Sequence, residues 1–275
     1  MKSLIDEHFQ IQLCRLYPHL YTAMRQIVQQ YDSTLQSVEQ TKDHGALTIE
    51  ASFGRLAYGE ERNFDRTIPV CLMNTIFTLL SSFDAWDSIS DWFLVYEYYT
   101  SDQTSVRISY ENKVQTIQQT TKRTLSVSDC SYSTSNLTWK LREYLTRVTL
   151  SIEQVAETMQ EVSEFSSVDI SMRKYFVIQS FNLPSVSFQF ELVQSWVGET
   201  VAIAEERLKT SEPRCTFSCK VMNVSVATPL TAIEKSILFT SLLLKMQDFL
   251  DIPMLTKVLQ QNDRLPVVID SFEIL

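Results

Sequence analysis

Glycine and histidine are scarce in this chain of 275 residues, which has four glycines and three histidines. A phosphate-binding glycine loop or a dinucleotide fingerprint needs several closely spaced glycines, and those of this chain are spread from Gly45 to Gly198. The histidines all precede the first predicted strand, which favours surface or packing roles over catalysis. The chain is therefore not expected to be a P-loop or Rossmann-type nucleotide-binding protein.

Basic charge is also in short supply, because 24 Lys and Arg face 33 Asp and Glu, for a net charge of −9. This balance argues against a mainly electrostatic nucleic-acid binder, although it is compatible with a locally basic tunnel. The five scattered cysteines indicate free thiols in a reducing compartment. No signal peptide fits the first residues, and no apolar run is long enough to span a bilayer. We expect an intracellular protein, in the cytoplasm or nucleus or in a virion if viral, with no membrane partner.

The spacing of apolar residues predicts three main helices. A three- and four-residue period runs through residues 4–40, a second helix is predicted over 69–82, and a strongly apolar third over 231–250. Thr231 and Glu234 have the spacing of a capping box at the start of that third helix. Period-two alternation predicts strands at 47–53, 93–99, 104–110, 114–119, 121–127, 144–153, 172–181, 186–196 and 214–226.

The segments between these elements are predicted as loops, including residues 54–66. A short helix is possible around 154–167 and another at 253–261 in the tail. No repeat, low-complexity run or convincing linker interrupts the chain, so we expect a single domain over 1–275. Its expected parts are an N-terminal helix 4–40, a β region of about 46–226, and a C-terminal helix and tail 229–275.

Alternation also sorts the strand side chains by face. In the first strand Thr48, Glu50 and Ser52 share one side, and apolar side chains share the other. Charged residues fall on the polar face of later strands in the same way: Arg107, Arg147, Glu191 and Lys220. This pattern usually indicates an antiparallel sheet with one face in solvent, and the alternative is a barrel whose polar faces line a tunnel. The pattern alone leaves both architectures open.

Two segments are similar in sequence to known motifs. Residues 48–54, Thr-Ile-Glu-Ala-Ser-Phe-Gly, are similar to a strand reading Glu-x-Glu-x-Arg-Phe-Gly, and residues 147–153, Arg-Val-Thr-Leu-Ser-Ile-Glu, to Arg-[Ile/Val]-Ser-Leu-Ser-x-Glu. Counterparts of the other motifs follow in order at 105–109, 121–123, 174–181, 188–192 and 217–221. Over roughly 45–250 the chain thus resembles the metal-dependent RNA 5′-triphosphatases of the triphosphate tunnel type, found in fungal, protist and large-DNA-virus mRNA capping systems.

The resemblance implies an α+β fold, an antiparallel eight-stranded β-barrel of the triphosphate tunnel type flanked by helices. It also implies a site in which carboxylates hold Mg²⁺ or Mn²⁺ and basic side chains stabilise the γ-phosphoryl group of an RNA 5′-triphosphate end. The implied catalytic and metal-binding carboxylates are Glu50 and Glu191. The implied phosphate-binding residues are Arg107, Lys122, Arg147, Lys174 and Lys220.

The chain departs from the family pattern where the metal would bind. Thr48 replaces the first Glu of the opening pair and Ser52 its Arg, while Gln189 replaces an arginine. Ser218 and Lys220 stand where the closing Glu-x-Glu pair is expected, and a lysine there repels a cation. A lining with more bases than acids suits an anion better than Mg²⁺, so we expect no cofactor, and Mg²⁺ or Mn²⁺ only if the protein is active.

Three functions remain open from the sequence. The first is a pseudoenzyme that keeps the barrel as a scaffold or subunit, with protein partners in a capping, transcription or virion assembly. The second is an active metal-dependent polynucleotide 5′-phosphatase that removes the RNA γ-phosphate. The third is an unrelated all-β interaction protein with accidental motif matches. The chemistry of the departures favours the first.

Overall fold

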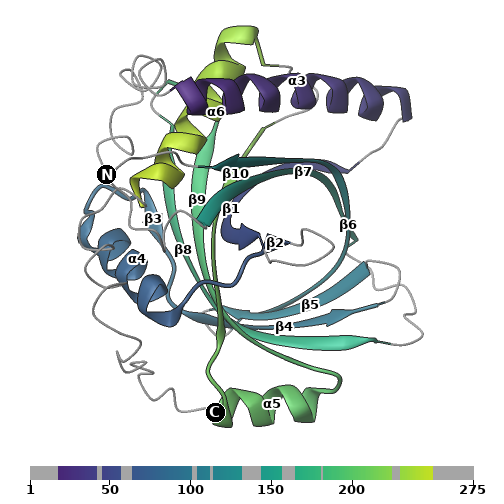
Figure 1. Cartoon of the computed structure of the whole chain (residues 1–275). Helices are drawn as coiled ribbons and strands as arrows, with labels where there is room; N and C mark the ends of the chain where they lie inside the picture. Colours follow the sequence, from purple (N-terminus) through teal and green to yellow (C-terminus); the bar gives the residue numbers. More distant parts are fainter. Residues whose placement is uncertain are drawn as a thin grey trace.

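Eight antiparallel strands close into a barrel in the computed structural model (Figure 1). The structure describes residues 18–41, 45–56, 64–100, 104–111, 114–131, 144–156, 165–180, 182–224 and 230–249. The barrel strands are β1 (Ala46–Leu56), β4 (Phe93–Tyr99), β5 (Thr104–Glu111), β6 (Val114–Ser131), β7 (Tyr144–Ala156), β8 (Ser167–Gln179), β9 (Ser187–Gly198) and β10 (Arg214–Met222). Their order is β10-β9-β8-β4-β5-β6-β7-β1, and β1 pairs back with β10. The open sheet that the alternation left possible is therefore wrong, and the predicted fold class is confirmed.

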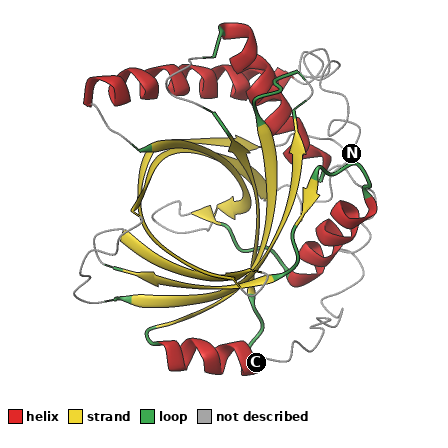
Figure 2. Cartoon of the chain, turned by 180° about the vertical axis from the view of Figure 1, so that it is seen from behind, coloured by secondary structure: helices red, strands yellow, loops and turns green. Residues whose placement is uncertain are grey.

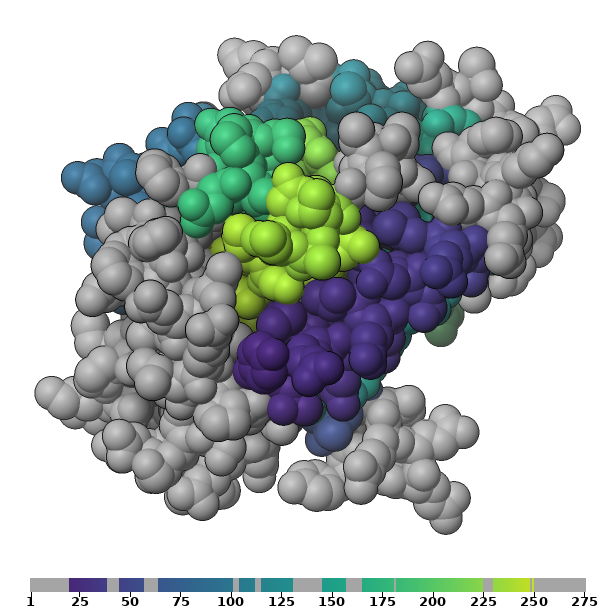
Figure 3. Space-filling model, turned by 90° about the horizontal axis from the view of Figure 1, so that it is seen from above, coloured from purple at the N-terminus to yellow at the C-terminus, as the bar shows by residue number. Residues whose placement is uncertain are grey.

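Helices cover the outside of the barrel because the outward side chains are apolar. Figure 2 shows α3 (Pro18–Thr41), α4 (Val70–Ser82) and α6 (Ala232–Asp248) around one side, and α5 (Val201–Thr210) below it. Helix α3 packs on α6, β6 and β7, α6 on β1 and β10, and α5 on β8 and β9. The space-filling view of Figure 3 shows α3 and α6 side by side on one surface. Within the described residues, no helix is both long and apolar enough to cross a membrane.

Two short strands pair with barrel strands without being part of the closed ring. Strand β2 (Phe64–Asp65) pairs with the end of β1, in a segment that the sequence predicted as loop. Strand β3 (Ser88–Ile89) pairs with β8. A buried bridge from Ile68 to Cys215 ties the segment after β2 to β10.

Several predicted boundaries need correction. Strand β6 is continuous where two strands, 114–119 and 121–127, were predicted, and a bulge lies between Thr124 and Ser126. Strand β8 begins at Ser167 rather than 172. Strand β10 ends at Met222 because Asn223 adopts a φ of 65°, in the left-handed region that stops a strand.

Helix α5 was not predicted. Its apolar face is short: Ala204 is buried against Val168 and Ile170, and the half-buried Val201 and Leu208 pack beside it. Residues 154–156 are strand rather than helix. Residues 165–167 are not helical either, and Ser167 begins β8. Residues 157–164 of that predicted helix, the start of the first helix and the tail at 253–261 lie outside the described residues.

The apolar core lies between the barrel and its helices. Phe217 and Phe190 stack at 6.2 Å between ring centroids, and Phe249 packs edge-on against Phe217 at 4.9 Å. The first strand contributes its predicted apolar face to the same core. Aromatic contacts of this kind add to the free energy of burial.

Truncating the centre of this core should destabilise the protein strongly. Phe217 is 1 % exposed, so Phe217→Ala is expected to lower the free energy of unfolding by about 3–5 kcal/mol, from lost burial and the cavity left behind. Ile117→Ala, on the outer face of β6 with 44 % exposure, is the control and should cost no more than about 1 kcal/mol. Denaturant unfolding would measure both, and equal losses would contradict the assigned core.

Candidate functional site

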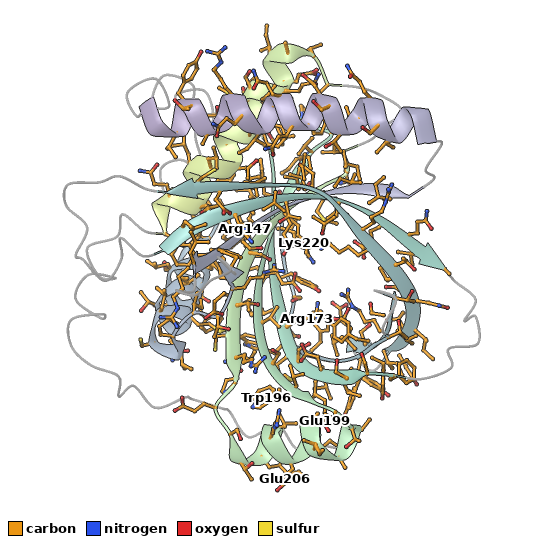
Figure 4. The ribbon with its side chains drawn as sticks, turned by 45° about the vertical axis from the view of Figure 1, so that its right-hand side comes forward. Arg147, Arg173, Trp196, Glu199, Glu206 and Lys220 are labelled. Carbon is orange, nitrogen blue, oxygen red and sulfur yellow. The ribbon has the colours of Figure 1, made fainter. Side chains whose placement is uncertain are left out.

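The inward face of the barrel carries the polar side chains that the first strand predicted. Glu50 lies opposite Lys220 of β10 and Thr149 of β7. Lys220 in turn lies opposite Gln189 of β9, which places it on the lumen face. In Figure 4 the labelled Arg173 and Lys220 lie inside the ring of strands. The register thus gathers charged side chains from strands far apart in the sequence.

A chain of ion pairs crosses the lumen from β5 to β10. It joins three bases and two buried carboxylates through alternating contacts. The pairs are Arg107 Nη2 with Glu97 Oε1 at 3.2 Å, Arg173 Nη2 with Glu97 Oε2 at 2.8 Å, Arg173 Nη1 with Glu191 Oε1 at 3.1 Å, and Lys220 Nζ with Glu191 Oε2 at 2.8 Å. Arg173, at the centre, is only 8 % exposed.

The cations of this ion-pair network keep its two buried carboxylates, Glu97 and Glu191, ionised. Burial alone would raise the pKa of Glu191, but Lys220 and Arg173 lower it to about 2. Burial likewise opposes ionisation of Glu97, whose pKa Arg107 and Arg173 hold below its usual range. Glu191 raises the pKa of Lys220 in return. The lysine and the carboxylates are therefore charged together at neutral pH.

Glu50 forms a second cluster of the same kind. Lys122 Nζ donates to its Oε2 at 3.1 Å, while Arg66 Nη2 donates to its Oε1 and, at 2.6 Å, to Ser52 Oγ. Burial opposes the ionisation of Glu50, but Arg66, Lys220 and Lys122 hold its pKa well below the usual range. The Glu50 carboxylate is thus enclosed by cations of this chain.

Arg147 of β7 lies opposite Ser52 and binds an acid of the next strand, β6. Its Nε and Nη2 bind the two carboxylate oxygens of Asp129 at 2.6 and 2.7 Å. The Phe64 ring lies against its guanidinium, 4.4 Å from centroid to Cζ. A bidentate pair with an aromatic contact is a strong arrangement for an arginine.

Lys174 is not a lumen residue, which corrects its predicted placement. It alternates with Arg173 along β8 and so lies on the outer face, where Nζ donates to the Ser90 carbonyl at 2.8 Å. Its ammonium also lies 5.7 Å from the centroid of the Phe176 ring. The remaining predicted residues, Glu50, Arg107, Lys122, Arg147, Glu191 and Lys220, are carried by the lumen face.

Sequence reasoning missed four residues of the lumen network: Arg66, Glu97, Asp129 and Arg173. Arg173 and Glu97 lie in or beside strands that were predicted, and their alternation was the available signal. Arg66 lies in a predicted loop and Asp129 beyond the predicted end of a strand, so no pattern marked them.

Asp169 is an acid of the same face that lacks full compensation. It lies opposite Glu97 on β4, and its buried Oδ1 has no hydrogen-bond partner among the residues that the structure describes. Burial raises the pKa of Asp169 to about 6; Arg173 and Arg214 oppose this rise and Glu97 adds to it. The folded state thus disfavours the charged form of the Asp169 side chain.

The lumen does not offer a donor set suited to Mg²⁺ or Mn²⁺. Such hard cations take several oxygen ligands, with carboxylates supplying the charge. Both carboxylate oxygens of Glu50 and of Glu191 already accept from Arg or Lys. Across the described ranges, no group of three or more His, Cys, Asp or Glu side chains is placed to hold a metal ion.

A separate groove of about 620 Å³ lies outside the barrel, between α3 and β6. Its lining is mostly neutral: Gln26, Gln29, Gln30, Ser33, Thr34, Ser37, Leu125, Ser126, Val127, Ser128 and Asp129. The groove lacks a base and a nucleophile in catalytic arrangement, so the charged lumen is the better candidate site.

The closed barrel with a charged lumen is the architecture that the resemblance to triphosphate tunnel proteins implies. No protein-family model and no curated protein matches the chain. Among solved structures, it is similar to S. pombe Pct1 RNA triphosphatase, at 12 % identity and a TM-score of 0.44, covering 82 % of this chain and 88 % of that one. It is also similar to the Mimivirus capping enzyme triphosphatase, at 11 % identity and a TM-score of 0.47, covering 81 % and 97 %.

A third structure, Pct1 in complex with the Spt5 CTD, is similar at 13 % identity and a TM-score of 0.46, covering 85 % of this chain and 90 % of that one. At these scores the interpretation of the lumen rests on the chain's own residues.

Removing Arg173 should leave two buried carboxylates with one cationic partner fewer each. Arg173→Met is expected to lower the free energy of unfolding by about 3–5 kcal/mol, because Glu97 and Glu191 each lose one of two cations. Lys174→Met, one residue along on the outer face, is the matched control and should cost far less. Urea unfolding at neutral pH would compare them, and a larger loss for the Lys174 variant would contradict the lumen network.

Asp169 should make stability fall with rising pH. Its folded pKa, about 6, is above the ordinary 3.8, so its contribution is complete below the ordinary value and is lost as pH rises through 6. Asp169→Asn should therefore match the wild type near pH 4 and exceed its stability by on the order of 1–3 kcal/mol at pH 8.

The control is Asp84→Asn, at an exposed position after α4. Thermal unfolding across this pH range would test the difference. A gain from Asp169→Asn that does not change with pH would refute the assignment.

Proposed function

We propose that this chain is an RNA triphosphatase-like tunnel protein that serves as a non-catalytic subunit or scaffold in a capping or transcription apparatus. The observation that carries the proposal is the engagement of every carboxylate oxygen of Glu50 and Glu191 by a cationic side chain. Lys220, placed between these two acids on β10, adds a charge that repels a metal ion.

The basic side chains of the lumen are also already paired, with acids of the same protein. Metal-assisted phosphoryl transfer needs cationic groups that are available to the transferred phosphoryl oxygens. Arg173 and Lys220 already bind Glu191, and Arg147 binds Asp129. An RNA 5′-triphosphate end entering the lumen would have to compete with these intramolecular anions, which disfavours turnover.

The outside of the barrel offers surface for protein partners. Tyr110 on β5 and Ile117 on β6 point outward and are 42 % and 44 % exposed. Apolar side chains that lie together on a surface are suited to protein–protein contact, and these two lie on paired strands. We propose partners within a capping, transcription or virion assembly, and an intracellular location.

The proposal is tested by phosphate release from RNA with a labelled γ-phosphate, and from nucleoside triphosphates, with Mg²⁺ or Mn²⁺ present. The wild type should give the same background rate as Glu50→Gln/Glu191→Gln. Release by the wild type that this double variant lacks would establish the alternative, an active polynucleotide 5′-phosphatase. The matched variant separates true turnover from a contaminating phosphatase.

A further inference from the structure

A short strap, residues 64–68, crosses the lumen face at the end of β1. Figure 1 draws β2, the start of the strap, within the ring of strands. Gly54 follows Glu50 and Ser52 on this face, and a Cβ there would lie 2.3 Å from the Asp65 carbonyl oxygen and 2.7 Å from the Phe64 ring. The strap therefore lies directly against the lumen face, in space that only glycine leaves open.

Contacts at both ends hold the strap in this position. At its start, the Phe64 ring packs on the Arg147 guanidinium, and Asp65 pairs with Arg55 at 3.6 Å. At its end, the buried Ile68 donates its backbone N–H to the Cys215 carbonyl at 2.8 Å. The Thr67 N–H donates to Asp65 Oδ1 at 2.9 Å and closes the turn between them. Arg66 is thus presented from a fixed backbone.

The guanidinium of Arg66 meets a niche formed by Glu50 and Ser52. Its Nη2 donates to Glu50 Oε1 and to Ser52 Oγ, while Ser52 also donates to Glu50 Oε1 at 3.3 Å. Lys122 occupies the other carboxylate oxygen from β6. Ser52 is buried and short, so it leaves the space that the arginine enters.

We propose that the Glu50–Ser52 niche is a guanidinium site filled in cis by Arg66, and that this side chain takes the position a divalent cation would need. The inference rests on the proposed non-catalytic function and gives it a physical cause. Arg66 of the strap supplies a positive charge that compensates Glu50, so this carboxylate needs no metal ion for charge balance.

The surroundings of the niche suit a guanidinium better than a metal ion. The nearest lumen neighbours on β1 and β7, Thr48 and Thr149, are neutral, and the next acid along the lining, Glu153, accepts a hydrogen bond from Thr48 at 3.4 Å. A divalent ion would need further anionic ligands and would lie close to the charges of Lys122 and Lys220. A guanidinium spreads one charge over several donors and satisfies a carboxylate and a hydroxyl together.

Chemical rescue tests the site. Arg66→Met should lower the Tm by several degrees, because the buried Glu50 loses a cation. Millimolar methylguanidinium should restore part of the loss, and methylammonium at equal ionic strength should restore less. Arg55→Met, which removes the exposed partner of Asp65, is the matched control and should show no such rescue. Absence of a Tm loss in Arg66→Met, or equal rescue by the two cations, would overturn the proposal.

A measurement on the wild type keeps the test independent of that variant's folding. The electron paramagnetic resonance signal of free Mn²⁺ should be undiminished by the wild-type protein. Mn²⁺ binding that Glu50→Gln abolishes would show that a metal, not Arg66, fills the niche. Phosphate release reports separately on the proposed function, so the two failures are distinguishable: turnover refutes the non-catalytic role, and Mn²⁺ binding that depends on Glu50 but gives no turnover refutes the guanidinium site alone.

Discussion

The structure depends on the neutralisation of carboxylates that the closed barrel takes out of water. An uncompensated buried carboxylate costs several kcal/mol, so each one needs cationic partners within reach. Glu191 and Glu97 share Arg173, and Glu50 has Arg66 and Lys122. This requirement explains why the lumen is charged yet internally balanced.

The same balance limits what the lumen can bind. A metal ion would have to displace cations from Glu50 or Glu191, and a phosphate would have to displace carboxylates from Arg173 or Lys220. Either exchange breaks a buried pair and leaves a charge uncompensated. Stability and catalysis therefore make opposing demands on the same side chains, and the contacts of this chain satisfy the first.

Much of the barrel could be predicted from the sequence because alternation is a local signal. The strand predicted at 93–99 coincides with β4, and the capping box at Thr231 and Glu234 is present. Closure depends on the pairing of β1 with β10, which no local pattern specifies. Arg173 lies within the strand predicted at 172–181 and was missed because the motif comparison began at Lys174, the residue next to it on the opposite face. Arg66 was missed because its position depends on a strap whose contacts form only when the barrel closes.

The lumen ion pairs also define the register of the strands that close the barrel. Lys220 lies opposite Glu50 on one side and Gln189 on the other, and its neighbour Cys219 is fully buried in the apolar core. A slip of one residue that exchanged these faces of β10 would place the lysine among apolar side chains and leave Glu191 with Arg173 as its remaining cation. Apolar packing alone tolerates variation in its partners, whereas a buried charge does not. We infer that the charged lining helps to select one closed register.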